Sequence, residues 1–97
     1  MHEIISSFAG KYGLSRGETM AEIEVAFSAM LTRWHRMPVL VSFRENMRLE
    51  AVAYNDTEGV VMQRPIDLET MKGRNSILRF LENSLAKASV IKETGQF

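Results

Sequence analysis

The stretch VLVSFRENMRLEAVAY, residues 39–54, sets the architecture of the chain, because its apolar residues alternate with period two. Such alternation is typical of strands that bury one face and expose the other. It predicts two antiparallel strands joined by a tight turn. The side chains expected to face the core from these strands are Val39, Val41, Phe43, Leu49, Ala51 and Ala53.

The length of the turn fixes the register of this hairpin. A two-residue loop would pair Phe43 with Arg48 and would mix apolar and polar side chains on each face. A three-residue loop, residues 45–47, pairs Phe43 with Leu49 and keeps the apolar side chains together. Asn46 can adopt the left-handed conformation that such a loop requires. We therefore predict the three-residue loop.

Two helices are predicted before the hairpin, a short one over residues 3–12 and a long one over residues 18–36. Ser15 and Glu18 have the Ser-x-x-Glu spacing of a capping box at the start of the long helix, and Pro38 ends it. Its apolar residues recur at helical spacing. The face expected to pack in the core consists of Ile23, Phe27, Met30, Leu31 and Trp34.

A third strand and a closing helix are predicted after the hairpin. The strand covers residues 60–64 and ends at Pro65. The helical period returns at residue 67 or 68 and continues to about residue 91. Gly73 is a point at which the first turn of this helix can separate from the rest. The expected core face is Ile77, Leu78, Leu81, Leu85 and Ala88.

The order helix, helix, three strands, helix predicts an α+β fold. A three-stranded antiparallel sheet with helices packed on one face is the simplest way to bury these apolar stripes together. The 97 residues are expected to form a single domain. Residues 1–14 would form the short helix and its loop, residues 15–92 the α-β-β-β-α core, and residues 93–97 a frayed tail.

Composition narrows the class of function. Twelve Lys and Arg balance twelve Asp and Glu, so the net charge does not attract the chain to nucleic acid or to a membrane. The absence of cysteine excludes disulfides and thiolate metal sites. No apolar run approaches the ~18 residues of a membrane span, and the N-terminus lacks the basic region of a signal peptide. We expect a cytosolic protein.

The sequence contains no motif typical of an enzyme. A Gly-x-Ser-x-Gly elbow, a P-loop and a Gly-x-Gly-x-x-Gly loop are all absent. His2 and His35 have no partner at metal-ligand spacing, and the position of His35 at a helix C-terminus is explained by the helix dipole. We therefore expect a binding module without catalytic activity and without a cofactor.

Two groups of basic residues are candidates for contact with a partner. In the predicted register Arg44 faces Arg48 on the outer side of the hairpin, and Arg64 would lie nearby on an adjacent third strand. Facing like charges are destabilising unless something neutralises them, which Glu45, Glu50, a phosphate or an acidic protein surface can do. The second group is a polar face of the closing helix, which is compatible with solvent or with a phosphate backbone. It consists of Lys72, Ser76, Arg79, Asn83 and Lys87.

Apolar side chains are also predicted on the outer face of the hairpin. Leu40 would pair with Val52 there, with Tyr54 beyond them. An apolar patch on the solvent side of a sheet indicates a covering helix or a protein interface. Two alternatives follow: the short first helix covers these residues, or they form an interface such as a homodimer contact.

Two stretches of the chain resemble the N-terminal domain of the bacterial transcription elongation and antitermination factor NusA. The first is GLSR at residues 13–16, leading into EVAFSA at residues 24–29. The second runs from Val60 to LAK at residues 85–87, through Arg64, Ile66, Thr70, Lys72 and Ile77. The sequence departs from the family at Pro65, which interrupts an Arg-Ile step, and in the shorter segment between the strands. The RNA-binding domains of the whole factor are not among the 97 residues.

The resemblance implies a globular head that docks on RNA polymerase near the RNA exit. We therefore expect a module that contacts RNA polymerase or another protein of the transcription or RNA machinery. The alternative is a self-associating module that uses Leu40, Val52 and Tyr54. The basic residues expected to carry partner contacts are Arg44, Arg48, Arg64, Lys72, Arg79 and Lys87.

Overall fold

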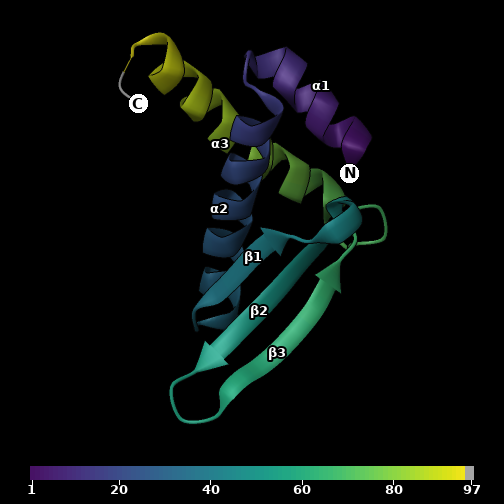
Figure 1. The fold of residues 1–97 in the computed structure, drawn as a ribbon, viewed down its shortest axis with the longest axis vertical. Helices are drawn as coiled ribbons and strands as arrows, with labels where there is room; N and C mark the ends of the chain where they lie inside the picture. The colour runs from purple at the N-terminus through teal and green to yellow at the C-terminus, as the bar shows by residue number, and fades with distance from the viewer. Residues whose placement is uncertain (96–97) are drawn as a thin grey trace.

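The computed structural model describes residues 1–95 as three helices and a three-stranded antiparallel sheet (Figure 1). The predicted fold class and element order are confirmed. Within the described residues no helix is long and apolar enough to cross a membrane. The elements are α1 (His2–Tyr12), α2 (Arg16–His35), β1 (Val39–Phe43), β2 (Leu49–Asn55), β3 (Gly59–Ile66) and α3 (Arg74–Glu93). Of the predicted tail, residues 96–97 lie outside the described range.

The hairpin has the predicted register. Phe43 pairs with Leu49 and Leu40 pairs with Val52, so one face of both strands is apolar and buried. The loop is a short turn of 3₁₀ type, Glu45–Met47, in which Asn46 has a φ of 59°. Met47 also has a positive φ, 61°, which is uncommon for a residue other than glycine or asparagine. The three-residue loop is therefore confirmed.

Helix α2 covers the free edge of β1 with polar side chains spaced four residues apart. Four residues of α-helix advance ~6.0 Å and two residues of strand ~6.7 Å, so every fourth helical side chain meets the next outward N–H, which lies two residues further along the strand. These bonds satisfy N–H groups that an edge strand would otherwise leave unpaired. The three bonds run from the Val39 N–H to Thr32 Oγ1 (3.0 Å), from the Val41 N–H to Ser28 Oγ (2.8 Å) and from the Phe43 N–H to Glu24 Oε2 (2.8 Å).

The helices gather at one end of the molecule, and only α2 extends along the sheet (Figure 1). α2 packs on β1, whereas α3 packs mainly against α2 and α1. The opposite face of the sheet carries no helix (Figure 1). Of the two alternatives for this face, the one in which the short first helix covers it is wrong, because α1 packs on the other two helices.

The closing helix begins later than predicted. Gly73 has a φ of 74°, in the left-handed region, and helical structure starts only at Arg74. The preceding loop is fixed locally, since the Asp67 carboxylate accepts a bond from the Glu69 N–H (3.0 Å) and Leu68 is buried. Residues 67–73 therefore form a loop, although their apolar spacing is compatible with a helix.

Most of the predicted core is buried, and three positions differ, of which Phe43 is one because it is only partly buried. Phe27, Leu81 and Leu85 are among the fully buried side chains, but Leu78 is only partly buried and Trp34 is exposed. Trp34 lies on the last turn of α2, where the neighbouring chain is the loop before α3 rather than a turn of helix. The later start of α3 thus explains why Trp34 is not covered.

The capping box at the start of α2 also joins this helix to the end of α3. The Glu18 N–H donates to Ser15 Oγ (3.0 Å), and the Ser15 N–H donates to Glu18 Oε1 (2.8 Å). Lys92 donates to the same Glu18 oxygen (2.7 Å) and to the carbonyl of Gly13 (3.3 Å). The hydrogen bond from Lys92, followed by those from Ser15, lowers the pKa of Glu18 to about 2.

Helix α1 is joined to α3 through Glu82. The Lys11 ammonium (2.6 Å) and the Tyr12 hydroxyl (2.9 Å) both donate to Glu82 Oε1. About two turns further along α3, the Ser89 hydroxyl donates to the carbonyl of Tyr12 (2.6 Å). The end of α1 is therefore held on α3 while its buried residues Ile5 and Phe8 enter the core.

We predict that Leu81→Ala lowers the free energy of unfolding by ~2–5 kcal/mol, because it opens a cavity at a fully buried position. Chemical denaturation measures this change. Val90→Ala on the same helix is the matched control; since Val90 is 58% exposed, a loss within about 0.5 kcal/mol is expected. Equal effects of the two substitutions would show that the face of α3 is assigned wrongly.

We predict that Glu18 titrates near pH 2 in the folded protein, below its ordinary range. Because its pKa is lower in the folded state, the stabilisation is complete above the unfolded pKa and is lost as pH falls towards 2. An NMR titration of the Glu18 carboxyl carbon measures the pKa directly. Lys92→Met should raise it and Lys87→Met should not; an ordinary pKa in the wild type would contradict the contact.

Candidate functional site

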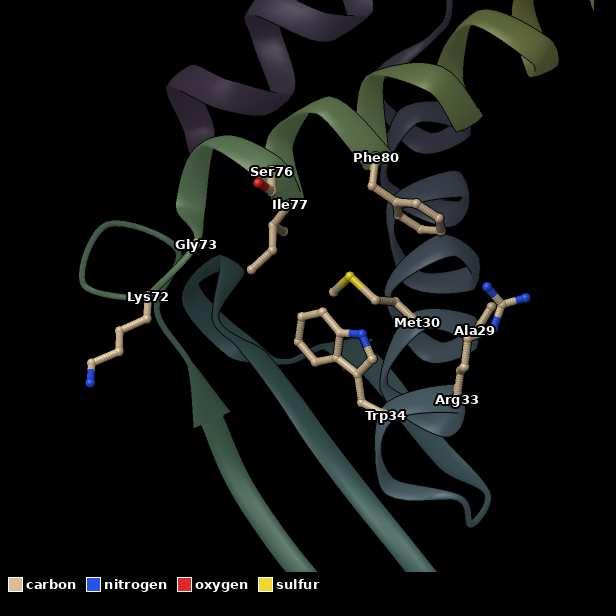
Figure 2. A pocket seen from close by; sticks show the side chains of 9 residues that line it. All are labelled: Ala29, Met30, Arg33, Trp34, Lys72, Gly73, Ser76, Ile77 and Phe80. Atoms are coloured by element: carbon tan, nitrogen blue, oxygen red, sulfur yellow. The ribbon is translucent and has the colours of Figure 1, made fainter.

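A cavity of about 360 Å³ opens between α2, α3 and the loop that precedes α3 (Figure 2). Helix α2 contributes Met30 and Trp34, which are one turn apart, and α3 contributes Ile77 and Phe80. These four side chains point towards a common space (Figure 2). The cavity is therefore formed where the two helices diverge.

The apolar lining consists of a buried floor and exposed walls. Met30 and Ile77 are buried and belong to the core. Trp34 is 57% exposed and Phe80 is 39% exposed, so both aromatic rings remain accessible from solvent. Large accessible aromatic side chains around a concave site are the residue type that most often dominates binding energy in protein interfaces.

The charge around the cavity has one sign. Arg33 and Lys72 lie at its opposite ends, and no Asp or Glu is among the nine residues that line it (Figure 2). Within residues 1–95 neither cation takes part in an ion pair. The first turn of α3, which borders the cavity at Gly73 and Ser76, contains no acidic residue either. The site thus combines an apolar interior with a positive rim.

This arrangement is suited to binding a group that has an apolar part and negative charges beside it. An apolar group can displace water from the floor, and negative groups beside it can meet the two cations. No three His, Asp or Glu side chains are close enough together to hold a metal ion in the part of the chain that the structure describes.

The three arginines predicted on the sheet do not form one site. Arg44 and Arg48 face each other, and the Arg44 N–H donates to the Arg48 carbonyl (2.6 Å). Arg44 also has an acidic neighbour, because Glu50 Oε1 lies 3.8 Å from its Nε. Arg64, however, pairs with Ala51, whose side chain is on the helix-covered face. The expectation that Arg64 lies beside the other two is wrong, since the register of β3 turns it to the opposite face.

The predicted polar face of the closing helix is exposed but is neither continuous nor purely polar. Lys72 precedes α3, and with Ser76 it borders the cavity; Arg79, Asn83 and Lys87 continue along the exposed surface. Phe80 lies four residues after Ser76 and therefore interrupts this face with an exposed aromatic ring. Phe80 is the residue in the sequence that indicates the cavity, and the predicted sites, which followed the charged residues of this helix, did not include it.

The apolar residues of the outer sheet face are where the sequence placed them. Leu40 is 57% exposed and Tyr54 51% exposed, while Val52 is partly buried between its neighbours. Of the two alternatives, cover by the first helix is excluded by the packing of α1 on α2 and α3. The face is open in the described structure.

Comparisons with protein-family models, with curated proteins and with solved structures found no match. The resemblance to the NusA head domain therefore stays a prediction.

Proposed function

We propose that the protein is a non-catalytic binding module that takes an apolar anchor residue from an acidic protein segment into the cavity between α2 and α3. The observation that carries the proposal is the exposure of Trp34 opposite Phe80 above an apolar floor. When a partner covers an exposed tryptophan, the apolar area removed from water and the aromatic packing both contribute favourable free energy of binding.

The size and shape of the cavity favour a side chain of a protein over a free small ligand. Its volume is near the lower end of the ~300–1,000 Å³ typical of small-molecule sites. The walls are two exposed helical surfaces rather than an enclosing shell, so a ligand would keep contact with solvent. An anchor residue carried by a longer segment can use this site together with the neighbouring helix surfaces.

The positive charge at the rim of the cavity supports the proposal that the partner segment is acidic. Arg33 and Lys72 flank the cavity from opposite ends, so a segment lying across it meets a cation on each side of its anchor. Exposed charges of this kind contribute mainly to association rate and selectivity, and their effect weakens as salt screens them. Binding should therefore be sensitive to ionic strength while depending on the aromatic residues for its affinity.

We further propose that the partner belongs to the cytosolic transcription or RNA machinery, with RNA polymerase as the first protein to test. This part of the proposal rests on the resemblance in residues 13–29 and 60–87. The resemblance thus suggests which protein the partner is, whereas the cavity indicates that the partner presents an apolar residue beside acidic ones.

The test measures binding of purified RNA polymerase, and of a library of acidic peptides each with one aromatic or aliphatic anchor. We predict that Trp34→Ala weakens the selected interaction more than tenfold and that Phe80→Ala weakens it in the same direction. Tyr54→Ala is the matched control, because Tyr54 is an aromatic residue of similar exposure on the sheet. Arg33→Glu should weaken binding at low salt more than at high salt.

The opposite pattern would place the site elsewhere. If Tyr54→Ala abolishes binding and Trp34→Ala does not, the open sheet face is the binding surface. The second candidate function would then be favoured, a self-associating module that uses Leu40, Val52 and Tyr54. A loss confined to the Arg44→Glu, Arg48→Glu double variant would instead assign partner binding to the tip of the hairpin.

A further inference from the structure

The two edges of the sheet differ in how they are protected. The outward N–H groups of β1 are bonded to side chains of α2. At the other edge, no side chain within residues 1–95 bonds to the backbone of Gly59–Ile66, and β2 is the main packing neighbour of β3. Figure 1 shows β3 with no element beyond it. An unprotected edge strand is a template for pairing with another chain.

The hydrogen-bond pattern identifies which groups of β3 point outward. The bond from the Arg44 N–H to the Arg48 carbonyl sets the alternation of β2, so Ala51 and Ala53 turn their backbone groups towards β3. Their partners Arg64 and Met62 turn theirs towards β2. Gln63, which lies between them, therefore presents its N–H and C=O to solvent.

The free part of this edge is short and almost uncharged. An irregularity of the pairing lies between Ala53 and Tyr54, opposite Val60 and Val61, and Pro65 cannot donate a hydrogen bond. Val60 and Val61 are 51% and 40% exposed. Valine favours strand structure, so these exposed residues are suited to pairing with another strand. Lysine, which commonly protects such edges, does not occur in the strand.

We propose that β3 pairs antiparallel with β3 of a second copy of this chain, about a two-fold axis near Met62. The two three-stranded sheets then form one continuous sheet. Met62 is near the middle of the eight-residue strand, so this axis allows the longest overlap. This axis places the outward N–H and C=O of Gln63 beside the Val60–Val61 segment of the other copy. The hydrogen bonds between the two strands then do not require an N–H from Pro65 of either copy.

The charges of the chain are compatible with this pairing. The protein carries no net charge, so two copies do not repel each other as whole molecules. Arg64 is the only charged residue of β3. An axis at Met62 sets it opposite Val60 of the other copy, and the two Arg64 positions are four residue steps apart, ~13 Å. Glu58, just before the strand, is brought towards the other copy's Arg64.

The interface expected from this pairing is small. Two short strands bury less than the ~1,200–2,000 Å² of a standard specific interface, so the dimer should dissociate on dilution. Each dimer carries two cavities between α2 and α3. Binding to a partner with two acidic segments would therefore be strengthened by effective concentration, without new contacts at either cavity.

A charge swap at Met62 tests the proposal. In the paired strands Met62 of one copy is next to Met62 of the other, so Met62→Lys and Met62→Glu each place like charges side by side. Sedimentation velocity over a concentration series should show a wild-type dimer and at least a tenfold higher dissociation constant for each variant alone. An equimolar mixture of the two variants should recover association, which a merely unfolded variant cannot do.

Two further variants separate pairing from effects on the fold. Gln63→Pro removes an N–H that the isolated sheet does not use, and it should also weaken the dimer at least tenfold. The pair Val90→Lys and Val90→Glu, on the exposed surface of α3, is the matched control and should associate like the wild type. A wild type that is monomeric at every concentration overturns the proposal. So does a mixture of Met62 variants that fails to recover, or a dimer lost in Leu40→Glu but not in Gln63→Pro.

Discussion

The rest of the structure depends on the three hydrogen bonds between the edge of β1 and helix α2. A buried or half-buried N–H without a partner costs ~1–3 kcal/mol, so the bonds to Glu24, Ser28 and Thr32 favour one position and one direction of the helix on the strand. The helix must run antiparallel to β1, because residue 24 meets residue 43 and residue 32 meets residue 39. A shift of α2 by one residue would leave all three N–H groups unpaired.

That constraint determines which surfaces remain available for binding. With one side of α2 bonded to β1, its apolar stripe faces α3, and Ile23, Phe27 and Leu31 are buried. The last turn of α2 continues past the point at which α3 begins, so Trp34 is left beside an open cavity. The same contacts close one edge of the sheet and leave β3 as the edge on which a second chain can add. The two proposed interactions thus follow from one packing arrangement.

Local features could be predicted from the sequence because local energies determine them. The hairpin register follows from keeping Phe43 and Leu49 on one face, and the capping box follows from the spacing of Ser15 and Glu18. The start of α3 was harder to predict from the sequence, because residues 67–72 have helical apolar spacing and only the left-handed Gly73 separates them from the helix.

Features that depend on two distant segments were not predicted. The exposure of Trp34 depends on where α3 starts, and the face of Arg64 depends on the β2–β3 register, which no short turn signal fixed. Glu24, Ser28 and Thr32 are spaced by four residues, but this spacing alone does not indicate that their partner is the edge of a strand. Their match to the period of two in β1 is the relation that would have revealed the packing.

The central claim is that α2 closes the β1 edge while the β3 edge stays free, and amide hydrogen exchange tests it most directly. At a dilution that keeps the protein monomeric, the N–H groups of Val39, Val41 and Phe43 should exchange slowly and that of Gln63 fast. Ser28→Ala should speed exchange at Val41 more than at Val39 or Phe43. Exchange at Val41 as fast as at Gln63 in the wild type would contradict the account.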